Sequence, residues 1–199
     1  MLTINNLTFA INERIFFRKF SITLLPSAII YLQGKNGCGK SSLLKMIADV
    51  QQPTSGSIFY NTSIISELKK PYCTYLGHNL GLKFQLTVFE NLKFWAETYD
   101  SVETLPSAIH YFNLYDILDK KCYTLSAGNL KKVALSRLIA CHSNLWLLDE
   151  VEANLDHENK SLLQNLIISK ANNNGIVIIT SHHQISIKTA QTLLLQEYN

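Results

Sequence analysis

One short stretch decides the fold of this chain: Gly34-Lys35-Asn36-Gly37-Cys38-Gly39-Lys40-Ser41. It fits the pattern G-x-x-x-x-G-K-S/T. An apolar run at residues 28–32 precedes it, and apolar residues at helical spacing follow over residues 40–50. This order predicts a buried strand, a glycine-rich loop and a helix. In that context a phosphate-binding loop is a far better interpretation than a glycine turn with a chance lysine.

Each part of this loop suits the phosphates of a nucleotide. The glycines let the backbone wrap a phosphate, and N–H groups of the loop and of the helix N-terminus would hold the α- and β-phosphates. Lys40 would reach the β- and γ-phosphate oxygens, and the Ser41 hydroxyl would bind Mg²⁺. Ser42, the next residue, is also expected at the nucleotide. The loop therefore predicts ATP and Mg²⁺ as ligands.

A second stretch supplies the acidic groups that such a loop needs. Residues 145–148 are apolar and predict a buried strand, and Asp149 and Glu150 follow directly. At the end of that strand Asp149 would meet the Mg²⁺ beside the loop. Glu150 would orient or deprotonate the attacking water. Without the loop upstream, a strand ending in a solvated acidic turn would be the better interpretation.

The remaining pattern predicts an α/β fold. Residues 2–25 mix apolar and polar residues at close to strand spacing. Three segments compatible with amphipathic helices follow: residues 88–99, 105–117 and 130–140. A helical segment at residues 156–170 then lies between the apolar runs at 145–148 and 176–179, which indicates a strand-helix-strand unit with a parallel sheet. We expect a single domain over residues 1–199, with a helical subdomain at about 85–140.

Composition argues against several other classes of protein. With 199 residues, 47% of them hydrophobic and 17% charged, the chain fits one ordinary globular domain. Its net charge of +3 is spread along the sequence and makes no case for a nucleic-acid partner. Its apolar runs are too short to span a membrane, and we expect no secretory signal. The cysteines have neither zinc-site nor disulfide-framework spacing: Cys38, Cys73, Cys122 and Cys141.

The segment between the two stretches points to a family. Leu125-Ser126-Ala127-Gly128-Asn129 precedes a predicted helix and resembles the signature Leu-Ser-Gly-Gly-Gln of the ABC ATPases. Ala127 replaces the first glycine and Asn129 the glutamine. A serine hydroxyl and glycine N–H groups at a helix N-terminus still form a second anion site. An ordinary capped helix would explain this segment alone. However, Leu155-Asp156 and Thr180-Ser181-His182 follow in family order, so the resemblance covers essentially the whole chain.

This resemblance implies a fold, a set of catalytic residues and a dimer. The fold is a P-loop ABC ATPase domain with an N-terminal antiparallel β region, a parallel core sheet and a helical subdomain. His182 would contact the γ-phosphate, with His183 as the adjacent alternative, and would act together with Lys40 and Glu150. On ATP binding two copies would form a head-to-tail homodimer. Residues 126–129 of each copy would then face the γ-phosphate bound by the other.

A narrower resemblance rests on the segment before the helical region. ABC ATPases carry a glutamine ahead of a segment like residues 86–92, whereas this chain has Gly77-His78-Asn79. The histidine, the Leu-Ser-Ala-Gly signature and the short length are similar to the haem-exporter branch, the ATPase subunit of cytochrome c maturation. His78 would then lie near the metal site. Asn79, Asn129 and Val151 depart from the branch, which usually has glutamine at the first two positions and often proline at the third.

The branch implies integral membrane permease subunits of the cytochrome c maturation complex as partners. The chain would then be peripheral, at the cytoplasmic face of the inner membrane. It would move the membrane partner through residues 78–84 and the helices after them. Because the substrate is a property of the partner, an ABC transporter with another substrate remains an alternative.

A soluble ABC ATPase acting on DNA or ribosomes belongs to a different class. The stretch from Lys40 to Gly128 is too short for the long coiled coil of DNA-repair relatives, and translation relatives usually carry two such domains in one chain. A catalytically weak regulatory subunit is suggested only by Asn129 and Val151. Direct haem binding would rest on isolated histidines alone: His78, His110 and His142.

The residue that stacks on adenine is left open. Phe9 and Phe16 are nearby aromatic candidates, but Ile11 aligns with the position that the family uses. Aromatic residues at strand spacing usually belong to the core. No adenine platform is therefore assigned.

Overall fold

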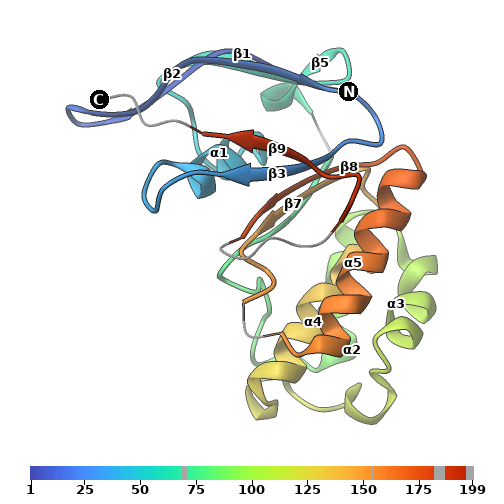
Figure 1. The fold of residues 1–199 in the computed structure, drawn as a ribbon. Helices are drawn as coiled ribbons and strands as arrows, with labels where there is room; N and C mark the ends of the chain where they lie inside the picture. The colour runs from blue at the N-terminus through green and yellow to red at the C-terminus, as the bar shows by residue number, and fades with distance from the viewer. Residues whose placement is uncertain (69–70, 154, 182–186, 196–199) are drawn as a thin grey trace.

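The chain folds into two β-sheets with helices between and beside them (Figure 1). The computed structural model describes residues 1–68, 71–153, 155–181 and 187–195. Within these ranges the strands are β1 (Leu2–Ile11), β2 (Arg14–Leu24), β3 (Ile29–Gln33), β4 (Ser55–Tyr60), β5 (Ser63–Ile64), β6 (Thr74–Leu76), β7 (Leu145–Asp149), β8 (Ile176–Thr180) and β9 (Gln191–Leu194). The α-helices there are α1 (Lys40–Ile47), α2 (Val88–Thr98), α3 (Leu105–Tyr111), α4 (Ala127–Ala140) and α5 (His157–Asn172).

The central sheet is parallel, with the strand order β6-β7-β8-β3-β9. Every residue of β7 and β8 is buried, as expected of parallel strands that are covered on both faces. The pairing of β7 with β8 confirms the predicted strand-helix-strand unit. By contrast, β6 and β9 are only three and four residues long, and the sequence pattern predicted neither.

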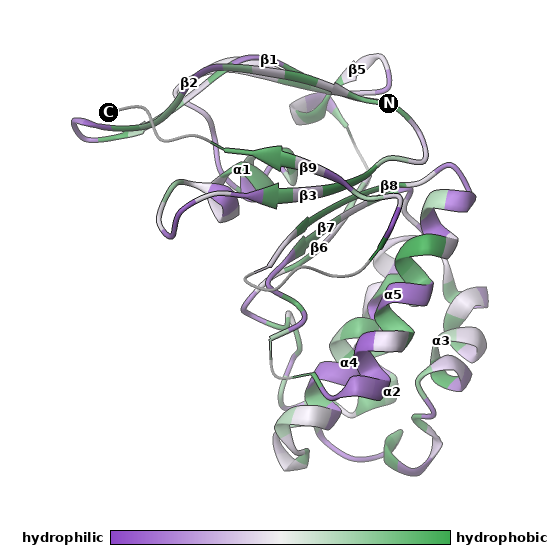
Figure 2. Cartoon of the chain, in the orientation of Figure 1, coloured by the Kyte–Doolittle hydropathy of each residue, from purple (hydrophilic) through white to green (hydrophobic). Residues whose placement is uncertain are grey.

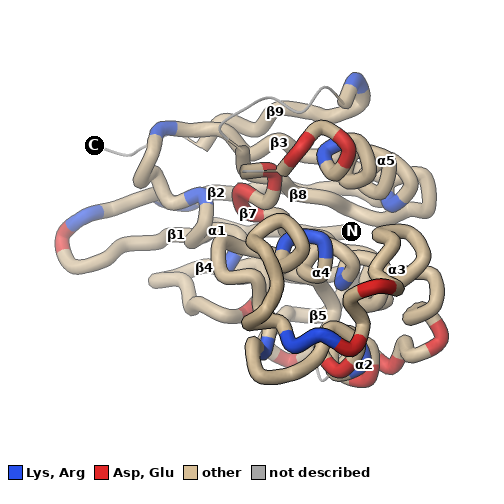
Figure 3. Tube along the Cα trace, turned by 90° about the horizontal axis from the view of Figure 1, so that it is seen from below, with Lys and Arg blue, Asp and Glu red and all other residues tan. Residues whose placement is uncertain are grey.

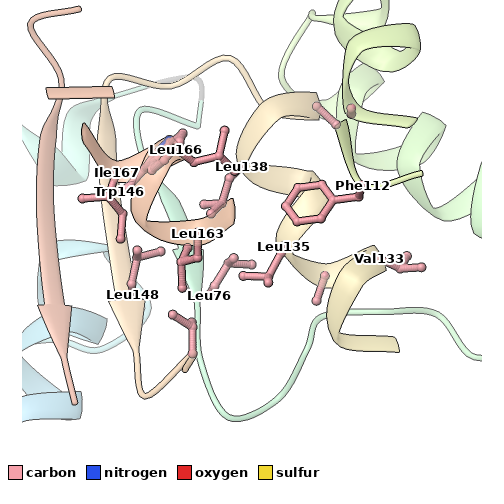
Figure 4. Close-up of a cluster of buried hydrophobic side chains, with 14 of the residues drawn as sticks. Leu76, Phe112, Val133, Leu135, Leu138, Trp146, Leu148, Leu163, Leu166 and Ile167 are labelled. Carbon is pink, nitrogen blue, oxygen red and sulfur yellow. The ribbon is translucent and has the colours of Figure 1, made fainter. Parts of the chain in front are cut away.

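Two hydrophobic cores lie on opposite faces of this sheet. Alternate residues of β7 enter different cores: Leu145 and Leu147 face the antiparallel sheet β2-β1-β4-β5 and α1, whereas Trp146 and Leu148 face the larger helices. Figure 4 shows Trp146 and Leu148 among side chains of α4 and α5, such as Leu138. In Figure 2 the parallel strands are largely hydrophobic, while the helices carry hydrophilic stretches. The parallel sheet is thus fixed from both sides.

Three of the described helices, α2, α4 and α5, begin at polar capping residues. Thr87 and Glu90 form a capping box at the start of α2: the Glu90 N–H donates to Thr87 Oγ1 at 3.1 Å, and the Thr87 N–H donates to Glu90 Oε2 at 2.8 Å. Ser126 and Asp156 accept a backbone N–H at the starts of α4 and α5. Within the described ranges, no helix combines the length and the apolar character needed to cross a membrane.

The helix predicted over residues 105–117 is wrong in its second half. α3 ends at Tyr111, and a separate 3₁₀ turn follows at Tyr115–Ile117. Asn113 adopts a left-handed conformation with φ of 47°, and the Leu114 N–H turns back to the Ile109 carbonyl at 3.0 Å. This arrangement closes a helix, and asparagine tolerates it better than most residues do.

The parallel strands bring several of the sequence motifs to one edge of the sheet. The glycine-rich loop follows β3, Asp149 ends β7, Thr180 ends β8, and residues 77–78 follow β6. These strands run in the same direction, so their carboxyl ends meet, and ligands of open α/β sheets bind at such an edge. Figure 3 shows acidic residues gathered at the end of β7.

A fully buried asparagine shapes the loop before α2. The Asn91 side chain donates to the carbonyls of Lys83 and Thr87 at 3.0 and 2.9 Å and accepts the Lys83 N–H at 2.7 Å. Its amide also donates to the Cys122 thiol at 3.2 Å. One side chain therefore holds residues 83–87 against the segment that precedes α4.

We predict that Asn91→Ala lowers the free energy of unfolding by about 2–4 kcal/mol, because it leaves several buried backbone groups unpaired and opens a cavity. Urea denaturation followed by circular dichroism measures this loss. The control is Lys93→Ala on the exposed side of α2, which removes only a surface ion pair and should cost less than about 0.5 kcal/mol. Equal midpoints for the two variants would contradict the role assigned to Asn91.

Candidate active site

The glycine-rich loop has the conformation that phosphate binding requires. Gly39 precedes α1 with φ of 101°, a left-handed conformation that favours glycine. A Cβ atom on Gly34 would lie 2.6 Å from Cys38 Sγ and 2.7 Å from the Leu195 carbonyl oxygen, so only glycine fits there. The Lys40 ammonium donates to the carbonyls of Gly34 and Lys35 at 2.8 and 3.0 Å. The loop is thus closed by its own lysine.

The Asp149 carboxylate is the meeting point of three other segments. Its Oδ1 accepts the hydroxyls of Ser41 at 3.1 Å and Thr180 at 2.6 Å, and its Oδ2 accepts the Tyr75 hydroxyl at 3.3 Å. Asp149 is only 6% exposed. Burial, and after it the Asp149 charge, raises the pKa of Tyr75 above its usual value, so the phenol keeps the proton that it donates.

Glu150 leaves the end of β7 in an unusual backbone conformation. Its φ of 54° lies in the left-handed region, which is uncommon for a residue other than glycine. The Glu150 N–H donates to the Thr180 carbonyl at 3.0 Å and to Thr180 Oγ1 at 3.1 Å. Neighbouring strand β8 therefore fixes the backbone of this residue.

Two cavities open beside Glu150. The first, of about 250 Å³, is lined by one aromatic residue, the glycine-rich loop and this carboxylate: Phe16, Asn36, Gly37, Gly39, Lys40, Ser41, Ser42 and Glu150. The second, of about 220 Å³, lies between the loops after β6 and β7 and the start of α4, and both His78 and Ala127 line it. Glu150 belongs to the wall of both cavities.

The signature-like segment lies at the start of α4. Ser126 accepts the Asn129 N–H at 3.3 Å, and Ser126, Ala127 and Gly128 are exposed. None of residues 126–129 lines the cavity of the glycine-rich loop. One turn along α4, Lys131 donates to the carbonyls of Val151 and Ala153, and burial lowers its pKa from the usual value. α4 is thereby tied to the turn that follows Glu150.

The structure brings together most of the residues that the sequence predicted around the loop. Lys40, Ser41, Asp149 and Glu150 meet at the edge of the sheet. His78 is exposed and shares the second cavity with Glu150. His182 and the competing His183 lie outside the described residues.

Three residues at this site were assigned no role from the sequence, although Phe16 was named as a candidate to stack on adenine. Phe16 lines the first cavity, whereas Phe9 is buried in the core and Ile11 is exposed on the first hairpin. Tyr75 and Thr180 reach Asp149 from β6 and β8. Thr180 belongs to the motif Thr180-Ser181-His182, but its contact with Asp149, like that of Tyr75, depends on which strands lie beside β7.

The residues at the loop fit a magnesium ion. Mg²⁺ prefers oxygen ligands and usually takes only one or two from the protein, with water and phosphate completing the shell. The Ser41 hydroxyl and the Asp149 carboxylate supply such oxygens side by side. Among the described residues there is no cluster of three or more histidine, cysteine or acidic side chains that would suit a metal held by the protein alone.

Known proteins share this sequence and this fold. The sequence matches the ABC transporter family over residues 17–153. It is 62% identical to the cytochrome c biogenesis ATP-binding export protein CcmA of Rickettsia bellii, over 98% of this chain and 100% of that protein. Its identity to the protein of the same name from Wolbachia pipientis is 36%, over 92% of this chain and 89% of that protein.

Solved structures agree on the fold. A putative ABC transporter ATP-binding protein from Pyrococcus furiosus is 25% identical and has a TM-score of 0.82, covering 98% of this chain and 96% of that one. An ATP-binding cassette solved as a dimer with ADP and Pi, 18% identical, has a TM-score of 0.83, covering 98% and 94%. The chain therefore belongs to the ABC transporter family, within the group of cytochrome c biogenesis ATP-binding export proteins, and it is an ATPase.

Proposed function

We propose that this chain hydrolyses Mg-ATP at the first cavity, as the ATPase subunit of a haem-exporter type membrane complex of cytochrome c biogenesis. The observation that carries the proposal is the convergence of Lys40, Ser41, Asp149 and Glu150 at one edge of the sheet. The 62% identity to the cytochrome c biogenesis export protein of Rickettsia bellii supports the assignment to cytochrome c biogenesis.

Each residue of the cavity has a distinct role in this proposal. The N–H groups of residues 34–42 and the N-terminus of α1 hold the phosphates, and the Lys40 ammonium exchanges its loop carbonyls for phosphate oxygens. Ser41 and Asp149 would hold a Mg²⁺ ion, which would neutralise phosphate charge. Glu150 accepts a hydrogen bond from the attacking water, aligns it and takes up its proton. Phe16, in the wall of the cavity, is the candidate to stack on adenine.

A homodimer completes the site. Residues 126–129 are largely exposed and do not line the cavity of the loop in their own subunit. Their hydroxyl and N–H groups would therefore contact a nucleotide bound by a second copy, in the head-to-tail arrangement of the family. His182 would contact the γ-phosphate. His78 lines the second cavity together with Glu150, and its contacts there would change when the γ-phosphate is bound.

The membrane partner would dock on an aromatic surface formed by Phe84, Phe89 and Tyr123. All three side chains are exposed. The Tyr123 N–H donates to the Phe84 carbonyl at 3.1 Å, and Asn91 holds the loop between Phe84 and Phe89. Exposed apolar side chains on a backbone that is held by hydrogen bonds are typical of a protein interface. The chain would thus sit peripherally at the cytoplasmic face of the inner membrane.

We predict that Glu150→Gln lowers the ATPase rate of the assembled complex by at least about 100-fold, because the amide cannot accept a proton from water. Binding of a fluorescent ATP analogue should persist, because the loop and Asp149 are unchanged. Glu103→Gln, the same change at an exposed site on the helical region, serves as the control and should keep its activity. Full hydrolysis by the Glu150 variant would overturn its assigned role.

The partner is tested by extracting the tagged Glu150→Gln chain from its native membranes in mild detergent, with and without Mg-ATP. We expect the small membrane subunits and haem-handling proteins of cytochrome c maturation to co-purify. Adding Phe89→Asp should reduce their recovery at least about tenfold, because it places a charge in the docking surface. Val102→Asp, at an exposed residue outside that surface, should not.

The same experiment separates the alternatives. Recovery of a different permease would keep the ATPase and discard cytochrome c biogenesis. Recovery of ribosomes or DNA-repair proteins would overturn the membrane assignment.

A further inference from the structure

A single hydroxyl group joins the two acidic residues of the site. Thr180 is the last residue of β8 and is fully buried. Its Oγ1 donates to Asp149 Oδ1 at 2.6 Å and accepts the Glu150 N–H at 3.1 Å. Since a hydroxyl has one proton, the bond to the carboxylate leaves a lone pair of the same oxygen for the N–H. Both contacts are therefore satisfied together.

Strand register places this hydroxyl. In the parallel pairing of β7 with β8, Thr180 lies opposite Asp149, and the next residue along β7 is Glu150. A β-branched side chain suits this buried strand position, and valine would fill the same volume. Shape therefore does not require a threonine here. What threonine adds is one donor and one acceptor between the two acidic residues.

The backbone of Glu150 needs such support. A φ of 54° is unfavourable for a residue with a Cβ atom, because the Cβ comes too close to the following carbonyl oxygen. The Thr180 carbonyl and hydroxyl both accept the Glu150 N–H, at 3.0 and 3.1 Å. Together they fix the peptide that links Asp149 to Glu150, and with it the direction in which the Glu150 side chain leaves the strand.

We propose that Thr180 is a positioning residue, which sets the metal-binding carboxylate and the water-aligning carboxylate relative to each other through one hydroxyl. This inference rests on the proposed function, in which Glu150 aligns the attacking water. Thr180 does not itself touch the nucleotide in this proposal. Its loss should therefore change the rate of hydrolysis more than the affinity for ATP.

The test compares Thr180→Val and Thr180→Ser in the full chain assembled with its membrane subunits. Valine keeps the shape and loses the hydroxyl, so we expect kcat to fall about 10- to 100-fold, as for the loss of a hydrogen bond to a charged group. The KM for ATP and the binding of a fluorescent ATP analogue should stay within about twofold. The urea midpoint should fall by no more than that of Thr180→Ser, because Asp149 keeps the hydroxyls of Ser41 and Tyr75 and the Glu150 N–H keeps the Thr180 carbonyl.

Serine gives the opposite pattern. It keeps the hydroxyl but loses a buried methyl group, so the urea midpoint should fall while kcat stays within about threefold of the unmodified chain. Tyr75→Phe provides a further comparison, because it removes a hydrogen bond to Asp149 without touching the Glu150 N–H. We expect a smaller loss of kcat from Tyr75→Phe than from Thr180→Val.

Each outcome supports or overturns a stated claim. If Thr180→Val keeps its kcat, or if Thr180→Ser loses kcat as severely as valine does, Thr180 is structural and the inference is wrong. A loss seen only in the KM for ATP would also overturn it. If the unmodified complex does not hydrolyse ATP at all, the proposed function fails first and the inference falls with it.

Discussion

The site depends on the buried carboxylate of Asp149. Ser41 from the start of α1, Tyr75 from β6 and Thr180 from β8 all donate a hydroxyl to it, so four segments distant in sequence are held at one point. Hydroxyl donors to an ionised acceptor make stronger hydrogen bonds than neutral pairs do. They also orient the carboxylate while leaving it able to bind a cation. The glycine-rich loop and Glu150 take their places around this residue.

Three hydroxyl donors offset the cost of burying this carboxylate, and the sheet beneath it keeps them in place. β7 is covered on both faces, with Leu145 and Leu147 in one core and Trp146 and Leu148 in the other. The strand therefore has little freedom to shift or to slip in register, since a one-residue slip would exchange its two faces. The polar chemistry begins where this apolar run ends, and the loops at that edge are free to carry function.

Much of this arrangement could be predicted from local sequence. The features that could not be predicted were missed for physical reasons. Short contiguous patterns predict three features: the loop at residues 34–41, the strands β3, β7 and β8, and the pair Asp149 and Glu150. β6 and β9 are too short to show a period, and the turn at Asn113 depends on one residue's tolerance of a left-handed conformation. The roles of Tyr75 and Thr180 follow from strand neighbours, which no single stretch of sequence specifies.

The helical region is coupled to the sheet edge by contacts along α4. Lys131 holds the Val151 carbonyl at 3.2 Å, just after Glu150. Two turns further, the buried Arg137 donates to the Leu80 carbonyl at 2.8 Å and stacks on Trp95, with 3.7 Å from its Cζ to the ring centroid. Trp95, on α2, donates to the Gly81 carbonyl at 3.0 Å.

These contacts connect the cavity beside Glu150 with the proposed docking surface for the membrane partner. The loop at residues 77–81 borders the cavity shared with Glu150, and it is also bound to α2, which carries part of the proposed docking surface. A Cβ atom on Gly81 would lie 2.5 Å from Arg137 Nη1, so this junction has no spare room. A densely packed junction passes on displacement instead of absorbing it. Under the proposed function, movement of the start of α4 would therefore displace both the turn after Glu150 and the proposed docking surface of Phe84, Phe89 and Tyr123.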